Sequence, residues 1–361
     1  MSRATRTTFT EQITRLHAEL AADGVAVNDM RRAQSLEHLY AGAFDAMAKP
    51  KRAISVEPLE GPIEPRPVSP ISPRDSRLRY FLDGAQRTFL ALRCNTIPIL
   101  ATVAATAILK RDNEGRCDVV PGTLRLKHAL IAPRRHPDPE LQRMLERIDR
   151  LGLAVLDPFD VDPQADEPDP ETHNLTDYGY LVEKSFRAGR TIRERLELEL
   201  LAEWSAGRID PTNREWLVVD GRLHEPSPRA IGLVKQFSDA YLSGAEAAMM
   251  LSLPPGYRTT AFFPSDKGRR GGPGPDARTL WYLRMWDAAG LDARYALVRV
   301  ETEPTIRSTT EIDQLSSWLW AERTPRATRD ARWATLLYPV HYLERILKRC
   351  LDADTQGWPR G

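Results

Sequence analysis

The sequence predicts an α/β core, with an α+β arrangement as the alternative, preceded by a helical appendage at the N-terminus. Apolar runs of strand length come early in the main part of the chain, and helices with apolar residues three and four positions apart are interspersed later. No repeat with a period of roughly 20 to 50 residues is present in the sequence. With 361 residues, 42% of them hydrophobic and 28% charged, the chain is long enough to bury a sizeable core.

Composition and charge argue against several classes of protein. No apolar stretch approaches the roughly 18 residues that span a bilayer, and the basic start is followed by polar residues, so we expect neither a membrane protein nor a secreted one. The three cysteines, Cys94, Cys117 and Cys350, lack zinc-type spacing, which favours a reducing cytoplasm. Because the net charge is only +1, any contact with nucleic acid depends on local basic clusters.

The first elements predicted are two amphipathic helices at residues 9–22 and 30–47, which form an N-terminal appendage over residues 1–48. Residues 49–76 are expected to be an extended connector or an edge strand, because their prolines exclude helix and central strand. These prolines are Pro50, Pro58, Pro62, Pro65, Pro67, Pro70 and Pro73.

The main domain is predicted over residues 77–351, with a tail at 352–361. It begins with a strand at 78–82, a tight turn and a second strand at 88–93. The apolar run at 97–109 is a third strand or a helix of small residues, since periodicity does not separate the two. The further elements expected are a strand at 124–132, a helix at 138–151, an acidic loop at 157–177, a helix at 178–205, strands at 216–220 and 231–235, a helix at 238–251, a basic loop at 265–276, strands at 279–285 and 295–301, and helices at 308–320 and 335–351.

Two of the strand-like segments end on the same dipeptide, Asp83–Gly84 and Asp220–Gly221. Glycine permits the turn with positive φ that lets the backbone leave a sheet while the acid stays at its edge. Two carboxylates on neighbouring strands repel each other unless a cation lies between them, and oxygen ligands suit a divalent metal. The alternative is a pair of ordinary Asp-Gly turns.

The helix between the two acids offers further carboxylates. Glu199 and Glu203 are four residues apart and share a face with Ile192 and Leu196, so we expect at least one to point inward, with Glu197 as the next choice. A solvated face paired with neighbouring arginines is the alternative. An inward acid would be compensated by the metal that the two strand-end acids hold.

Three residues outside this helix are also candidates. Lys235 ends an apolar strand, where it can meet a phosphate or simply protect a sheet edge. Tyr338 and His341 open the C-terminal helix beside Pro339, one turn apart, so both can face one site. A satisfied core or surface histidine is the alternative for His341.

The order of these features resembles the NurA nuclease family: an Asp-Gly, an acid-bearing helix, a second Asp-Gly, a strand ending in Lys235, and a late Tyr338–Pro339 helix with His341. The resemblance covers residues 77–351. It implies a ribonuclease-H-like mixed sheet flanked by helices, Mn²⁺ or Mg²⁺ held by Asp83, Asp220 and a helix glutamate, and a homodimer. It further implies 5′–3′ digestion of DNA with single-strand endonuclease activity, alongside a HerA-like hexameric ATPase, in DNA repair or phage defence.

Two departures from the family pattern leave other functions open. Ala85 stands where the family has Ser, and His341 follows Tyr338 closely enough that Glu344 is an alternative to it. The alternatives are a catalytically decayed adaptor that docks on an ATPase and a nuclease of the same fold that acts on RNA. No phosphate-binding loop, dinucleotide fingerprint or GxSxG elbow is present in the sequence.

Overall fold

The protein is a mixed α/β fold with a large mixed sheet flanked by helices, as the sequence predicts. The computed structural model describes residues 55–150, 154–161, 174–235, 241–265, 278–323 and 333–354, together with Ala18 and Ala22. Apart from Ala18 and Ala22, the helices expected at 9–22 and 30–47 lie outside these residues, as do most of the two expected long loops. Within the described ranges, no helix combines the length and apolar character needed to cross a membrane.

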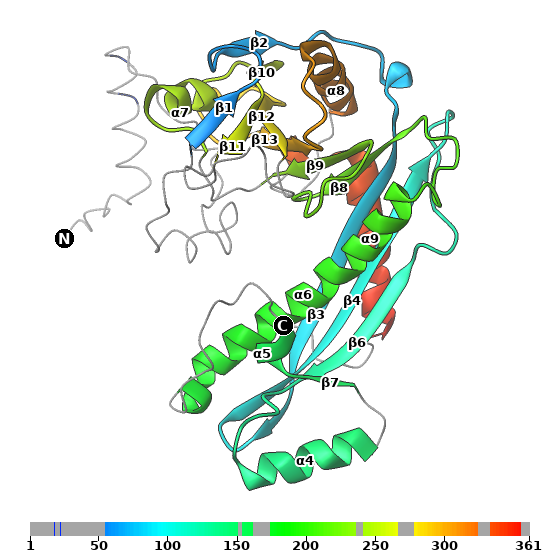
Figure 1. Ribbon diagram of the computed structural model, residues 1–361, viewed down its shortest axis with the longest axis vertical. Coiled ribbons are helices and arrows are strands. Elements are labelled where there is room, and N and C mark those ends of the chain that lie inside the picture. Colours follow the sequence, from blue (N-terminus) through cyan, green and yellow to red (C-terminus); the bar gives the residue numbers. More distant parts are fainter. Residues whose placement is uncertain are drawn as a thin grey trace, which may run out of the picture. The chain divides into compact units, whose positions relative to one another are not determined.

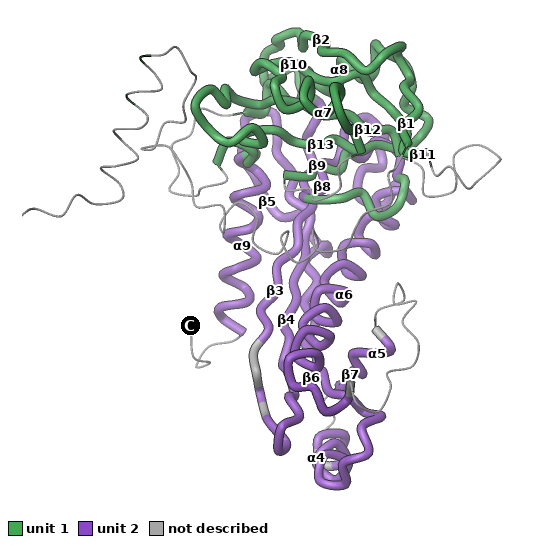
Figure 2. Tube along the Cα trace, turned by 90° about the vertical axis from the view of Figure 1, so that its left-hand side faces the viewer, with its two compact units in different colours: residues 1–76, 221–226, 231–337 green, residues 77–220, 227–230, 338–361 purple. Residues whose placement is uncertain are grey.

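The chain forms two compact units, coloured separately in Figure 2. Unit 1 comprises residues 1–76, 221–226 and 231–337. Unit 2 comprises residues 77–220, 227–230 and 338–361, so each unit is assembled from separate stretches of the sequence.

Unit 2 is built on a mixed sheet with the order β8-β3-β4-β6-β7 and β5 beside β4. Its strands are β3 (Leu78–Cys94), β4 (Ile97–Arg111), β5 (Cys117–Val119), β6 (Arg125–Ile131), β7 (Val155–Leu156) and β8 (Trp216–Asp220). Strands β3, β4 and β6 form an antiparallel meander, whereas β8 lies parallel to β3. The long segment between β6 and β8 makes this parallel pairing possible, because parallel neighbours require a crossover.

Helices cover both faces of this sheet (Figures 1 and 2). They are α4 (Pro139–Arg150), α5 (Pro158–Val161), the short η2 (Asn174–Thr176), α6 (Tyr178–Ser205) and α9 (Tyr338–Asp354). The sheet lies between α6 and α9, which explains why β4 is buried along nearly its whole length. The apolar run at 97–109, for which the sequence left helix and strand open, is therefore a strand that is apolar on both faces because both faces are covered.

Helix α6 has the bounds predicted from the sequence, and its start is fixed by a cap. The Asp177 side chain accepts a hydrogen bond from the Tyr180 amide at 3.1 Å. Its apolar face then packs on β4 and β6 in one buried cluster. That cluster contains Ala188, Ile192 and Leu196 of the helix with Leu100, Ala104, Ala129 and Ile131 of the sheet.

The prediction that the chain turns directly after Asp83 is wrong. Strand β3 continues from Leu78 through Gly84 to Cys94, in register with β4 over nearly its whole length. Gly84 does not adopt a positive φ, whereas Gly221 does, at 116°. The Asp-Gly dipeptide therefore marks a strand end only at Asp220.

Unit 1 is built on a second group of strands, with the order β1-β11-β12-β13-β9 and β10 bridging β12 and β2. Its elements are β1 (Ser55–Pro58), β2 (Pro65–Pro67), η1 (Pro73–Asp75), β9 (Ala230–Val234), α7 (Gly244–Leu251), β10 (Tyr257–Thr259), β11 (Phe262–Ser265), β12 (Thr279–Arg284), β13 (Leu297–Thr302), α8 (Thr309–Glu322) and η3 (Trp333–Thr335). Part of the expected proline-rich connector thus forms paired strands: β1 pairs with β11 and β2 with β10.

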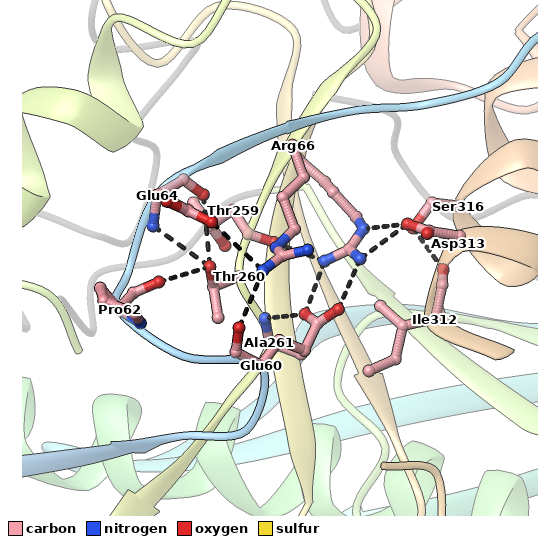
Figure 3. A network of polar contacts seen from close by, with 11 residues as sticks. Glu60, Pro62, Glu64, Arg66, Thr259, Thr260, Ala261, Ile312, Asp313 and Ser316 are labelled. Atoms are coloured by element: carbon pink, nitrogen blue, oxygen red, sulfur yellow. Dashed lines mark hydrogen bonds and ion pairs between the residues drawn. The ribbon is translucent and has the colours of Figure 1, made fainter. Parts of the chain in front are cut away.

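A buried ion network anchors the segment between β1 and β2 (Figure 3). Both guanidinium NH₂ groups of Arg258 donate to Glu60 at 2.7 Å, and Arg258 also donates to Asp313 of α8 at 2.6 and 2.8 Å. Glu60 accepts a further hydrogen bond from the Ala261 amide at 2.7 Å. Burial opposes ionisation of Glu60, but the hydrogen bonds from Arg258 and Ala261 keep its pKa below the ordinary value.

Candidate functional site

Asp83 and Asp220 lie on neighbouring parallel strands of unit 2. Leu82 of β3 is in register with Val219 of β8, and the two aspartates occupy the next position on each strand. Residues in register on parallel strands project to the same face, about 4.8 Å apart across the sheet. The sequence expectation that these two acids lie on adjacent strands is therefore confirmed.

The Asp83 side chain is nearly buried, at 6% exposed, and is tied to the strand around it. Its Oδ1 accepts a hydrogen bond from the Gly84 amide at 2.7 Å, and its backbone carbonyl accepts one from Thr106 Oγ1 of β4 at 2.8 Å. Strand β3 is thus held firmly at the position of the acid.

Glu197 of α6 approaches the same stretch of β3. A Cβ added at Gly84 would lie 2.1 Å from Glu197 Oε1, so the missing side chain makes room for this carboxylate. The glycine at position 84 is therefore explained by the close approach of Glu197 rather than by a turn.

Asp83 projects from the other face of β3, away from α6. Tyr80 contacts Trp204 of α6, and side chains alternate between the two faces along a strand.

Glu197 is the buried acid of the helix, at 8% exposed. Burial raises the pKa of its carboxyl to about 7; Arg193 opposes this rise, and the charges of Glu194 and Asp220 add to it. Burial is therefore the main cause of the raised pKa of Glu197.

The other helix acids are placed differently from the expectation. Glu199 is exposed, so the prediction that it lies on the apolar side of α6 is wrong. Glu203 is half-buried and pairs with Arg125 of β6 at 2.6 Å. The signal for Glu197 was present in the sequence: Leu200, Leu201 and Trp204 follow it at three, four and seven residues, and all three are buried.

The face of β3 that carries Asp83 is the one covered by α9. Arg87, four residues along on the same face, pairs with Asp352 of α9, and Figure 2 shows α9 running alongside β3. From Asp352 back to His341 is about 16 Å of helix, and from Arg87 back to Asp83 is about 13 Å of strand. His341 therefore lies near the level of Asp83.

The first turns of α9 hold Tyr338, His341 and Glu344. Tyr338 is 37% exposed and its ring stacks on Tyr342, with centroids 6.2 Å apart. His341 Nδ1 is 3.9 Å from Glu344 Oε2, and Glu344 Oε1 accepts a hydrogen bond from Lys348 at 2.7 Å. His341 and Glu344, the two residues that the sequence offers for the C-terminal motif, thus lie next to each other on α9.

Lys235 directly follows β9, in unit 1, and its Nζ is buried. The sequence prediction that this lysine ends an apolar strand is confirmed, because all five residues of β9 are buried. Its role toward a phosphate stays a prediction.

The residues of unit 2 offer oxygen donors, which is the chemistry that Mn²⁺ and Mg²⁺ prefer. Asp83 is the observation that fits a cation, since positive charge stabilises a nearly buried carboxylate that lies beside another acid. Over the part of the chain that the structure describes, no three His, Cys, Asp or Glu side chains are already gathered as a metal-binding group.

A scan against protein-family models found no match to the chain, and a search among curated proteins found no similar sequence.

Proposed function

We propose that this protein is a divalent-metal-dependent nuclease that hydrolyses phosphodiester bonds of DNA. The observation that carries the proposal is the register of β3 and β8, which gives Asp83 and Asp220 adjacent positions on parallel strands. The buried carboxylate of Glu197 packs against Gly84 on the other face of β3, so the proposed site consists of the two strand acids.

The topology of unit 2 supports a ribonuclease-H-like fold within this proposal. An antiparallel meander of β3, β4 and β6 is followed by α6 and then by β8, which returns parallel to the first strand of the meander. The resemblance of the sequence to the NurA nucleases points in the same direction.

Asp83 and Asp220 would hold Mn²⁺ or Mg²⁺ through their carboxylate oxygens. A bound divalent ion of this kind supplies an activated water and stabilises the leaving oxygen in phosphodiester hydrolysis. The chain itself fixes Asp83: the Gly84 amide donates to its side chain, and the Thr106 hydroxyl donates to its backbone carbonyl. Within unit 2, His341 of α9 is the candidate for moving a proton.

The experiment is cleavage of a 5′-labelled DNA duplex in Mn²⁺ by Asp83→Asn and Asp220→Asn. Asparagine keeps the shape of each side chain but removes the charge, so we expect both variants to lose cleavage while retaining the wild-type melting temperature. Glu199→Gln, on the exposed face of α6, is the matched control and should cut normally. If Asp83→Asn and Asp220→Asn both cut at the wild-type rate, the proposed site is wrong.

A HerA-like hexameric ATPase and a second copy of the chain are the partners that this proposal includes. Residues 1–48 were predicted to be two short amphipathic helices, which bury too little surface to be stable alone. Removing residues 1–48 should weaken self-association or ATPase binding in sedimentation and leave metal-dependent cleavage of short single strands intact. Unchanged assembly would refute this role for the segment.

A metal-free adaptor that docks on an ATPase is the second candidate, favoured by Ala85 where the family has Ser. Calorimetric titration with Mn²⁺ separates the two functions, because an adaptor should bind none. An RNA-directed nuclease of the same fold would be distinguished by comparing RNA and DNA substrates.

A further inference from the structure

The C-terminal end of helix α8, in unit 1, carries a cluster of one arginine and three tryptophans: Arg323, Trp286, Trp320 and Trp333. The guanidinium carbon of Arg323 lies 3.3 Å from the ring centre of Trp320 and 4.8 Å from that of Trp286. The rings of Trp286 and Trp333 are 5.4 Å apart and tilted by 53°. All four side chains are half-buried, so each keeps part of its surface exposed.

A structural role does not account for the Arg323 guanidinium. A cation that stabilises the end of a helix donates to the last carbonyls of that helix, whereas Arg323 donates to the Met285 carbonyl, at a long 3.4 Å. Arg284 of the same unit shows what a structural arginine does: it donates to the carbonyls of Leu251 and Ala293 at 2.7 and 2.8 Å. Most donors of Arg323 are thus not used by the residues that the structure describes.

The positive charge of Arg323 is also left uncompensated. Within the described part of the chain it forms no ion pair, and its contacts are the two indole rings and one carbonyl. Burial lowers the pKa of its guanidinium, as expected for a partly desolvated cation without a neighbouring anion. The sequence between Arg323 and Trp333 adds three arginines and one aspartate. An anion from outside the chain would therefore be favoured here.

The aromatic rings indicate which anion fits. Trp320 is held in place, because a Cβ at Gly256 would lie 2.9 Å from its Cζ2, and it keeps the guanidinium against its face. A guanidinium forms two parallel hydrogen bonds to a phosphate, and indole faces stack on nucleobases. Proteins that hold single strands combine these two contacts. A duplex cannot use the rings, because its bases are already stacked on one another.

We propose that Arg323, Trp286 and Trp333 form a binding site for single-stranded DNA, in which the guanidinium binds a backbone phosphate and an indole ring stacks on the adjacent base. The site belongs to unit 1, whereas Asp83 and Asp220 belong to unit 2. The inference rests on the proposed function for the identity of the nucleic acid, but binding at this site requires neither metal nor cleavage.

The test is a fluorescence anisotropy titration of labelled oligo-dT, about 20 nucleotides long, with the full-length protein in EDTA at several salt concentrations. Arg323→Gln should weaken binding and make the slope of log K against log salt shallower by about 0.7, the contribution of one phosphate contact in a single strand. Arg323→Lys keeps the charge and should keep the wild-type slope.

Two further variants separate stacking from charge. Trp333→Leu should weaken binding at least about fivefold, the loss expected for one stacking ring, and leave the salt slope unchanged. Arg307→Gln is the matched control, because Arg307 is an exposed cation 4.8 Å from the ring centre of Phe263 in the same unit. Its affinity should stay within about twofold of wild type. Melting curves verify that each variant is folded at the temperature of the titration.

The inference is overturned if wild type does not bind oligo-dT, or if Arg323→Gln and Trp333→Leu both keep the wild-type affinity and slope. It is also overturned if poly-glutamate displaces the DNA as efficiently as unlabelled oligo-dT does, since charge alone would then explain binding. None of these outcomes touches the two strand acids. Normal cleavage by Asp83→Asn and Asp220→Asn, with oligo-dT binding intact, would instead refute the proposed function and leave this site standing.

Discussion

The dipeptide Asp-Gly occurs at both candidate acids, and its glycine serves two different physical purposes. Gly221 has a φ of 116° and no atom within 4 Å of an added Cβ, so it is required for the turn that ends β8. Gly84 lies within a continuous strand, and a larger residue there would collide with the Glu197 carboxylate. Sequence alone predicted a glycine-dependent feature at both positions but could not separate these causes, because the neighbour of Gly84 comes from a distant helix.

Gly84→Ala tests the purpose of the first glycine. The added methyl group would displace the Glu197 carboxylate, which is the flexible end of a side chain, so the cost in stability should be small. We expect the displaced carboxylate to lose part of its burial, so that its pKa falls back toward the ordinary value. Melting curves recorded between pH 4.5 and about 7 measure both effects. An unchanged dependence of stability on pH would show that the contact of Glu197 with β3 does not determine its burial.

Glu197 should also make stability depend on pH. Its pKa is raised from 4.5 to about 7 in the folded protein, so between these values the folded state binds more protons than the unfolded state. The free energy of unfolding should therefore decrease as pH rises from 4.5 to 7, by at most about 3 kcal/mol. Urea denaturation in EDTA of wild type and Glu197→Gln measures this. The decrease should be absent from the variant, and parallel pH profiles would contradict the assignment.

Among the helices and strands, those with regular apolar spacing could be predicted from the sequence. Whether a strand continues past a glycine could not be predicted. Helix α6 and strand β8 have the bounds expected from the sequence. Their apolar spacing and flanking polar residues are local signals. The unbroken run of β3 through Gly84 depends instead on pairing with β4, which no local signal contains. The buried acid of α6 was misplaced by two residues, at Glu199 instead of Glu197, because the sequence does not show which positions of a helix its partner sheet covers.

The absence of a side chain at Gly189 allows α6 to pack closely against the sheet. A Cβ there would lie 2.7 Å from Thr102 Oγ1 and 3.2 Å from Thr88 Oγ1, two hydroxyls that hydrogen-bond each other at 2.5 Å. Gly189→Ala should lower the melting temperature, because crowding a packed interface costs about 1 to 3 kcal/mol and outweighs the gain of about 1 kcal/mol in helix propensity. Gly179→Ala, at the uncrowded start of α6, is the control and should not destabilise. A more stable Gly189→Ala would refute close packing at this point.

At the scale of the whole molecule, the division into two units was not apparent from the sequence. Strands β1, β2, β10 and β11 are each three or four residues long, and their partners lie about 200 residues away along the chain. Short edge strands rich in proline resemble linkers until their partners are known. The sequence thus predicted the α/β class and most long elements, but not these pairings.

The ion network of unit 1 should contribute strongly to stability. Glu60 and Arg258 are 1% and 0% exposed, and removing one partner of a buried pair costs about 3 to 5 kcal/mol. Glu60→Gln should lower the free energy of unfolding by about 3 kcal/mol, because Asp313 still pairs with Arg258. Glu64→Gln, at the exposed pair with Arg66, should cost less than about 1 kcal/mol. Equal effects of the two substitutions would contradict this ranking.

The pairing of Glu60 with Arg258 also has a consequence for how the protein is synthesised. The two residues are 198 positions apart, so a ribosome adding 5 to 20 residues per second leaves β1 and β2 without partners for roughly 10 to 40 seconds. Unpaired strands on a nascent chain invite association with other chains. Pro58, Pro65 and Pro67 lie in these two strands and cannot donate a ladder hydrogen bond. The same prolines that obscure the strands in the sequence therefore protect the nascent chain against premature pairing.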